Sequence, residues 1–286
     1  MIDLHQHSTF SDGTDNVEEL MKKNKAVGVK VMSITDHDNN QSVLIAKDLA
    51  NDIGLTYFSG IEFSTDYNGE SVHILCYGYD ADDKIIHNLI EESIKLRHKR
   101  VDLRLQKLED EFSINLGKDI IKKINDAPNP NKMMIANVLK DFGYGSSCEE
   151  IIKKYLYHKI SDCKLKTVEV LKQLRVASGV SVYAHPLGGV GEKKVDREMF
   201  EERLRVFIDA GLDGIECYYS LYNKEEQNYL IKIARKHNLL ISGGSDYHGK
   251  NKTVEIGELS NFGDFPTEKD VTILNKIKKV RLICLI

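Results

Sequence analysis

Two histidines two residues apart stand near the start of the chain, and an aspartate follows them. They are His5, His7 and Asp12. Residues i and i+2 of a β-strand face the same side, so both imidazoles would point toward one place. Imidazole is the commonest metal ligand among protein side chains. Two surface histidines would give the same short pattern, so the metal hypothesis depends on ligands elsewhere in the chain.

Further candidate ligands follow other apolar segments. Most lie at or just after the carboxyl end of an expected strand, although His73 lies near the start of its own. A parallel β/α barrel gathers its strand ends on one face, where active sites are built. The four remaining histidines, at 87, 98, 158 and 237, fall in expected helices. The candidate ligands are His5, His7, Asp12, His37, Glu62, His73, His185, Asp246 and His248.

The size and charge of this ligand set predict a cluster of metals. One zinc takes about four ligands, so a set of this size indicates two to three divalent ions, with Mn, Fe or Zn suited to mixed nitrogen and oxygen ligation. The carboxylates of Asp12, Glu62 and Asp246 neutralise half the charge of three such ions. With a bridging hydroxide, about two positive charges remain, which match a phosphate dianion. The expected chemistry is phosphoester hydrolysis by metal-activated hydroxide.

Alternating strands and helices must position these residues. Strands are expected over 2–5, 30–35, 55–63 and 72–79, with helices from Asn16 to Ala26 and over 41–53, and a turn at Asn68-Gly69. This alternation predicts a largely parallel sheet with crossover helices.

The alternation stops near residue 84 and resumes near residue 167. Between these points the spacing predicts helices, beginning with a long one capped by Asp82 or Asp83. The sequence therefore predicts an inserted helical domain, 84–166, between barrel parts 1–83 and 167–286. In the last part we expect helices over 167–177, 196–210, 223–237 and 267–279, and strands over 180–184, 213–218, 239–243 and 253–259.

The composition is that of a globular protein that remains in the cytoplasm. Hydrophobic residues make up 41% and charged residues 29%, and the formal net charge is −4. This charge disfavours binding to extended duplex nucleic acid. No apolar run approaches the roughly 20 residues that cross a membrane. Five scattered cysteines without a C-x-x-C pair predict reduced thiols rather than thiolate ligands.

Taken together, these motifs resemble the PHP family of metal-dependent phosphoesterases, named for polymerase and histidinol phosphatase. The matching segments are Asp3-Leu4-His5-Gln6-His7-Ser8, Ser11-Asp12-Gly13, Ile34-Thr35-Asp36-His37-Asp38, Gly60-Ile61-Glu62, His73, Ala184-His185-Pro186 and Gly244-Ser245-Asp246-Tyr247-His248. The resemblance implies an α/β fold, a distorted (β/α)7 TIM-like barrel, with a trinuclear site.

The resemblance also distributes the ligands among three metals. The first would take His5, His7, Glu62 and Asp246. The second would take His73 and His185, with Glu62 as a bridge. The third would take Asp12, His37 and His248, which would place Asp12 and His37 beside the leaving group as catalytic and substrate-binding residues.

The helical insertion resembles a subgroup that acts on nucleoside 3′,5′-bisphosphates or on the 5′ ends of short RNAs. In that subgroup an Arg-x-x-Arg pair and a Gly-Arg-Pro-His segment hold the substrate. Here Arg97 and Arg100 match the pair, and Lys132 stands where the second arginine is expected. A lysine binds phosphate without the bidentate fork of arginine. The implied substrate is a nucleotide or a short oligonucleotide.

Other interpretations of the site remain open. Histidinol phosphate is a second substrate for the same chemistry, although the large insertion disfavours it. Metal-dependent amide or amine hydrolysis also uses His-x-His barrels. A non-catalytic interaction module is disfavoured by the full ligand set. Asp36 and Asp38 are expected as caps or as partners that orient His37, and Glu216 is either such a partner or an ordinary buried carboxylate.

Overall fold

The computed structural model describes residues 1–127, 129–158, 160, 162–189, 192–263 and 265–277. The chain forms two compact units. The first comprises Met1–Leu89 and Lys166–Ile286, and the second comprises Ile90–Leu165. Within the described residues, no helix is both long enough and apolar enough to pass through a lipid bilayer.

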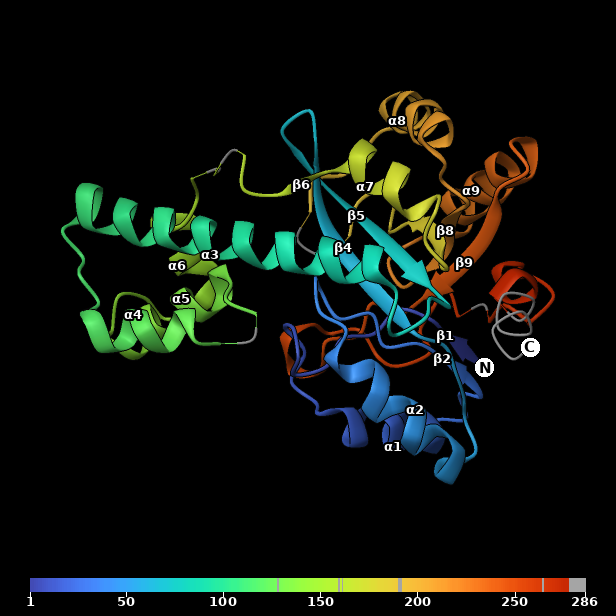
Figure 1. Ribbon diagram of the computed structural model, residues 1–286, viewed down its shortest axis with the longest axis horizontal. Helices are drawn as coiled ribbons and strands as arrows, with labels where there is room; N and C mark the ends of the chain where they lie inside the picture. Colours follow the sequence, from blue (N-terminus) through green and yellow to red (C-terminus); the bar gives the residue numbers. More distant parts are fainter. Residues whose placement is uncertain (128, 159, 161, 190–191, 264, 278–286) are drawn as a thin grey trace. The chain divides into compact units, whose positions relative to one another are not determined.

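The first unit begins with a small parallel sheet of three short strands. In order across the sheet they are β1 (Ile2–Asp3), β2 (Val31–Met32) and β3 (Thr56–Tyr57). Two crossover helices, α1 (Val17–Ala26) and α2 (Gln41–Ile53), connect them and pack against each other (Figure 1). The expected helix starts and ends are confirmed, because Asn16 forms a capping box with Glu19 and α2 ends at Gly54 in the left-handed conformation.

A larger sheet carries the remaining strands of this unit. Its neighbouring strands include, in order, β4 (Gly60–Tyr67), β5 (Glu70–Tyr77), β7 (Val180–Tyr183), β8 (Gly214–Tyr219) and β9 (Leu240–Gly244). Helices join the last strands and pack beside them (Figure 1). The other elements in this part of the chain are β6 (Leu165–Lys166), α7 (Thr167–Leu174), α8 (Arg197–Ala210), α9 (Lys224–Lys236) and the 3-10 helix η1 (Gly249–Asn251).

The expected single strand over 55–63 is two strands, and the expectation of one strand is wrong. Thr56 and Tyr57 pair with β2, whereas Gly60 and the residues after it pair with β5. The chain therefore passes from one sheet to the other at Phe58 and Ser59. A continuous apolar run in the sequence hides this change of partner.

Strand β5 differs from the expected parallel pattern. It runs antiparallel to both β4 and β7, while β7, β8 and β9 are parallel. The turn at Asn68-Gly69 makes β4 and β5 a hairpin, in agreement with the turn signal. This reversal explains why His73 joins the other candidate ligands although it lies near the start of its strand. The start of β5 lies beside the end of β7, because the two strands run in opposite directions.

The end of the chain departs further from the expected elements. Residues 253–259 do not form a strand. Gly257 has a φ of 79°, in the left-handed region, and its N–H donates to Asp3 Oδ2 at 2.8 Å instead of to a neighbouring strand. Of the helix expected over 267–279, residues 273–277 are helical. Its last two residues, and the apolar tail after them, lie outside the described residues.

Single hydrogen bonds and bridges connect the two sheets. The Leu4 N–H donates to the Gly243 carbonyl at 3.2 Å, and Gln6 pairs in parallel with Tyr247. On the other side, His37 pairs in parallel with Glu62. The smaller sheet thus links to both β9 and β4, the arrangement of a distorted TIM-like barrel.

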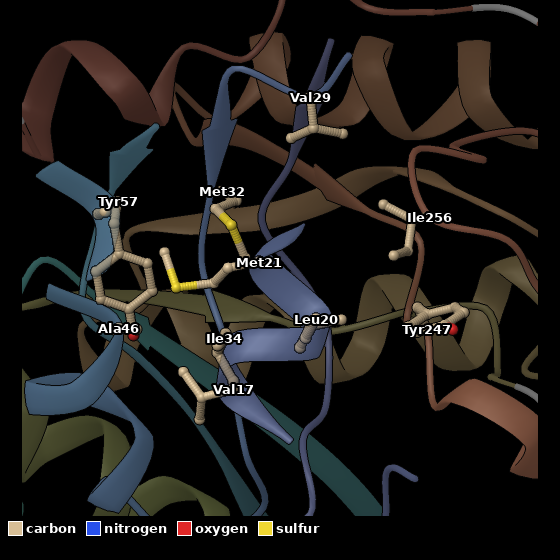
Figure 2. Packing of buried hydrophobic residues seen from close by; sticks show 11 residues of the cluster. Val17, Leu20, Met21, Val29, Met32, Ile34, Ala46, Tyr57, Tyr247 and Ile256 are labelled. Carbon is tan, nitrogen blue, oxygen red and sulfur yellow. The ribbon is translucent and has the colours of Figure 1, made fainter. Parts of the chain in front are cut away.

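A buried apolar cluster holds α1 and α2 against the smaller sheet. Figure 2 shows side chains from α1, β2, α2 and β3 meeting those of Tyr247 and Ile256. Met21, Met32 and Ile34 are fully buried there. This packing fixes the segments that follow β1 and β2, and these segments carry the first candidate ligands.

The second unit is helical. Helix α3 begins in the first unit and supplies one side of a separate apolar core that includes Val101, Leu139 and Ile151. Among residues 90–164, the described part contains no strand. The helices are α3 (Lys84–Phe112), α4 (Lys118–Asn125), α5 (Lys132–Asp141) and α6 (Cys148–Tyr155).

Candidate metal centre

Glu62 on β4 lies at the centre of the candidate site. Its Oε2 is 3.1 Å from His5 Nε2, 3.1 Å from His7 Nε2 and 3.2 Å from His37 Nδ1. Its Oε1 is 3.1 Å from His73 Nδ1 and 3.2 Å from His185 Nε2. One buried carboxylate therefore contacts all but one of the histidines that the sequence nominates.

The first group of converging ligand atoms comes from the segment after β1, from β4 and from the segment after β9. His5, His7, Glu62 and Asp246 are all buried and their ligand atoms lie within 4.8 Å of one another. Asp246 Oδ1 is 3.5 Å from His5 Nε2 and 3.4 Å from His7 Nε2. The two histidines of the opening motif do face one point.

The second group forms on the other oxygen of Glu62. His73 Nδ1 and His185 Nε2 lie 3.4 Å apart, and each faces Glu62 Oε1. His73 comes from β5 and His185 follows β7. Because β5 is antiparallel to β7, these two residues approach from opposite strand directions.

The third group surrounds Asp12. His248 Nε2 is 3.1 Å from Asp12 Oδ1, His37 Nε2 is 3.9 Å from Asp12 Oδ2, and His7 Nδ1 is 3.6 Å from Asp12 Oδ1. The ligand atoms of these four residues can meet within 4.8 Å. The structure therefore brings all nine sequence-nominated residues into three adjoining groups.

The donor atoms fit divalent ions. Among the described residues, His5 Nε2, His7 Nε2, Glu62 Oε2 and Asp12 Oδ1 are buried and make no hydrogen bond. A buried polar atom without a partner is costly. Ligands about 2.1 Å from a tetrahedral ion lie about 3.4 Å apart, close to the separations found here. The residues thus form a site that bound cations would complete.

Glu62 and His37 are held in the protonation states that bind metal. Burial disfavours ionisation of Glu62, but the facing His37 and His5 outweigh it and hold the pKa of Glu62 well below its ordinary value. Burial, supported by His7 and His73, lowers the pKa of His37 to about 3. An ionised carboxylate and a neutral imidazole are the forms that bind metal.

Unusual backbone geometry places two of the ligands. His185 follows β7 with φ 27° and Asp246 follows β9 with φ 61°, both in the region that favours glycine. Such backbone strain concentrates at functional sites. Gly244 precedes Asp246, and a Cβ there would lie 2.3 Å from His5 Cβ. The close approach of β9 to β1 therefore requires a glycine.

Buried carboxylates outside the ligand set orient its members. Glu216 Oε1 is 3.0 Å from His5 Nδ1, and its Oε2 accepts the His185 backbone N–H at 2.8 Å. Of the two interpretations of Glu216, the partner role fits this geometry. Asp36 accepts from Ser8 and Ser11, so it fixes the loop after His7 rather than His37.

Two charged residues in the cavity were missed by sequence reasoning. Seven of the nine candidate ligands, all but His5 and His7, line a cavity of about 200 Å³ together with Glu192 and Lys252. Lys252 Nζ donates to Asp246 Oδ2 at 2.6 Å, and Glu192 Oε2 is 3.1 Å from His185 Nδ1. Neither residue follows a strand or belongs to a recognisable motif, so only their proximity to the ligands reveals them.

The nominated substrate-binding cations lie in the second unit. Arg100 donates to the Cys163 carbonyl at 3.4 Å, and burial together with Arg104 and Arg100 lowers the pKa of Lys132. Burial and Arg97 lower the pKa of Arg104 to about 10. Arg104 thus joins Arg97, Arg100 and Lys132 in one cationic cluster. Arg104 lies four residues after Arg100 on α3, so the helical spacing in the sequence could have identified Arg104 as a member of the cluster.

A protein-family model matches the part of the chain that carries most of the candidate metal ligands. The PHP domain model matches residues 3–163, more than half of the chain. The chain belongs to the PHP domain family. Its fold and its similarity to metal-dependent phosphoesterases make it a hydrolase of phosphoric esters, which excludes the interpretation as a non-catalytic module.

Individual relatives match over most of their length. A 5′-3′ exoribonuclease of Haemophilus influenzae is 28% identical over 90% of this chain and 93% of its own. A phosphoribosyl 1,2-cyclic phosphate 1,2-diphosphodiesterase of Eggerthella lenta is 27% identical, over 87% and 94%. A 3′,5′-nucleoside bisphosphate phosphatase of Chromobacterium violaceum is 24% identical, over 86% and 87%.

Solved structures share the fold. A candidate metal-dependent phosphoesterase from Bifidobacterium adolescentis superposes with a TM-score of 0.79 and 25% identity, covering 98% of this chain and 96% of that one. A Chromobacterium violaceum protein described as an amidohydrolase superposes with a TM-score of 0.80 and 23% identity over the same shares. The second similarity concerns the fold alone.

Proposed function

We propose that the enzyme hydrolyses a phosphomonoester of a nucleotide, either a nucleoside 3′,5′-bisphosphate or a short RNA with a 5′-phosphate. The observation that carries this proposal is that the candidate ligands converge on the carboxylates of Glu62, Asp12 and Asp246 beside one cavity. Two to three divalent ions, Mn, Fe or Zn, would be held there. The proposed ligands are His5, His7, Asp12, His37, Glu62, His73, His185, Asp246 and His248.

The ions would supply Lewis acidity toward the phosphoryl group and lower the pKa of a water molecule. The protein residues orient the reacting groups. Asp12 has 35% of its side chain exposed and His37 has 13%, whereas Glu62, at 1%, lies at the bottom of the site. Asp12 and His37 are therefore proposed to contact the substrate on the leaving-group side and to be the catalytic residues among the ligands.

The charge of the cavity suits a phosphate dianion. Glu192 adds one negative charge to those of the ligand carboxylates, and Lys252 adds one positive charge beside Asp246. These two charges cancel, so the excess positive charge expected for three bound ions is preserved. A phosphate group would be attracted to the cavity by this excess.

The second unit is proposed to select the substrate. The insertion predicted over 84–166 contains Arg97, Arg100 and Lys132, and Arg104 adds a fourth cation to them. Arginine and lysine groups gathered in this way bind phosphates. We propose that this cluster binds a phosphate of the substrate.

The named activities of the relatives support a ribose phosphate as substrate. The relatives act, by their names, on RNA from the 5′ end, on a nucleoside bisphosphate and on a phosphoribosyl cyclic phosphate. The last of these favours a second candidate, hydrolysis of a cyclic phosphodiester.

The cytoplasmic location expected from the composition stays a prediction.

Phosphate release from adenosine 3′,5′-bisphosphate in the presence of Mn²⁺ tests the proposal. Wild-type enzyme should release phosphate, and His7→Ala should lose most of this activity, because His7 Nε2 faces both Glu62 and Asp246. His237→Ala, at the end of α9, is the matched control and should retain activity. Full turnover by His7→Ala would place catalysis elsewhere.

Parallel assays distinguish the substrates. A short RNA with a 5′-phosphate should yield mononucleotides, separated by chromatography, if the enzyme degrades RNA from that end. Preferential turnover of a phosphoribosyl 1,2-cyclic phosphate would favour the diester candidate. Preferential turnover of histidinol phosphate would contradict the nucleotide proposal while leaving the metal site intact.

A further inference from the structure

Glu192 lies on the segment between β7 and α8, close to the second ligand group. Its Oε2 accepts the Gly189 N–H at 2.9 Å and lies 3.1 Å from His185 Nδ1. Its Oε1 lies 3.7 Å from His73 Nδ1. One carboxylate therefore faces both histidines of this group.

The backbone around Glu192 is fitted to this approach. A Cβ at Gly189 would lie 3.0 Å from His185 Nδ1 and 3.2 Å from Glu192 Oε2. Both separations are tighter than ordinary van der Waals contact, so a side chain at this position would push the carboxylate away from the imidazole. The glycine allows the segment to bring Glu192 against His185.

The two ring nitrogens of His185 have different partners. Nε2 faces Glu62 Oε1 and His73 Nδ1, at the point where the second group converges. Nδ1 faces Glu192. An ionised carboxylate accepts a hydrogen bond from Nδ1–H, so the hydrogen stays on Nδ1 and the lone pair of Nε2 is available for a metal. Glu216 contacts Nδ1 of His5 in the same way.

We propose that Glu192 is a positioning residue of the second metal: it holds His185 in the tautomer with hydrogen on Nδ1 and places a negative charge beside His73. This inference rests on the metal centre of the proposed function. It assigns to Glu192 the part that Glu216 plays for His5. The chemical class of the ligand is a divalent cation bound by imidazole and carboxylate.

Titration of the protein with Mn²⁺ alone tests this assignment without an activity assay. Calorimetry and the paramagnetic resonance signal of free Mn²⁺ monitor the binding. Glu192→Ala should bind one ion per chain about 10- to 100-fold more weakly than wild type, with the other ions unaffected. Glu192→Gln retains an acceptor for the Nδ1 hydrogen, so its loss should be smaller. Unchanged affinity of every ion in Glu192→Ala would overturn the proposal.

A spectroscopic measurement separates tautomer control from general damage to the fold. In Zn²⁺-loaded protein with ¹⁵N-labelled histidine, His185 should show a protonated Nδ1 in wild type, and Glu192→Ala should lose this signature. Glu202→Gln, an exposed carboxylate on α8, should change neither measurement. Wild-type protein that binds no Mn²⁺ would overturn the proposed function, whereas unchanged Mn²⁺ binding by Glu192→Ala would overturn only this inference.

Discussion

His5 Nδ1 and Glu216 Oε1 lie 3.0 Å apart, although the two residues are 211 positions apart in the sequence. Both side chains are fully buried. A carboxylate at this nitrogen leaves Nε2 free for a metal and fixes the plane of the ring. We predict that Glu216→Gln will weaken binding of the first ion and lower kcat/KM by about 10- to 100-fold.

Metal analysis and steady-state kinetics on the same preparations check this prediction. Glu225→Gln is the matched control, because 79% of the Glu225 side chain is exposed. Equal metal content and equal kcat/KM in Glu216→Gln and wild type would show that His5 is oriented without Glu216.

Gly244→Ala should disrupt the approach of β9 to β1. The added Cβ would lie 2.4 Å from the His5 backbone N, so the strands must separate. Overpacking of this kind costs on the order of 1–3 kcal/mol of unfolding free energy. We expect a lower melting temperature together with weaker metal binding, because His5 and Asp246 flank the displaced contact.

Gly54→Ala is the control for that variant. Gly54 ends α2 in the left-handed conformation, and a Cβ there meets no atom within 4 Å. The substitution should cost about 1 kcal/mol through backbone strain and leave metal binding unchanged. If both variants lost stability but neither lost metal, the contact between Gly244 and His5 would have no part in forming the site.

The cationic cluster of the second unit gives a prediction about substrate binding. Lys132→Ala should raise KM for a nucleoside bisphosphate about tenfold, whereas Lys132→Arg should match or improve on wild type, because arginine binds phosphate with two parallel hydrogen bonds. Initial rates over a range of substrate concentrations measure both effects. Lys118→Ala, exposed in the same unit, is the control. An unchanged KM in Lys132→Ala would exclude Lys132 from the substrate site.

The titration of His7 predicts how pH affects the metal-free protein. Burial opposes protonation of His7, but Asp246 and Glu62 outweigh it and raise the pKa of His7 to about 9. Because the pKa of His7 is higher in the folded state than in the unfolded state, protonation of His7 stabilises the folded protein. That stabilisation is complete below about pH 6.5, the ordinary pKa of histidine, and is lost as pH rises through about 9.

We therefore expect the melting temperature in EDTA to fall between pH 6.5 and 9. Mn²⁺ must displace the His7 proton, so its affinity should rise over the same range and binding at pH 7.5 should release protons. Calorimetry in buffers of different ionisation enthalpy measures that release. A melting temperature in EDTA that rises with pH would contradict the assigned direction.

Much of the candidate site was predictable because its residues follow short apolar strands. The positions of His37, His185 and Asp246 after strands follow from the alternation of strands and helices, and parallel strand ends meet on one face. Glu62 instead lies near the start of β4, because the expected strand over 55–63 is two strands. The helix boundaries at α1 and α2 followed from Asn16 and from the glycine after residue 53, since caps are local signals.

The remaining features depend on contacts that no local pattern encodes. The passage from β3 to β4 is a change of partner within one apolar run, and the direction of β5 was not recognised from the turn before it. Residues 253–259 had the composition of a strand, but Asp3 takes the hydrogen bond that a strand would use. Glu216 acts on His5, which is distant in sequence, and Glu192 and Lys252 lie in loops that carry no recognisable motif.

The separation of His5 from Glu216 also constrains when the enzyme can become active during synthesis. A ribosome adds residues from the amino end, so the opening histidines emerge long before their partners. The ligand set is incomplete until His248 has left the exit tunnel. Such long-range closure is a late event in folding. A nascent chain therefore carries no assembled phosphoesterase site while the ribosome is still translating the codons that precede His248.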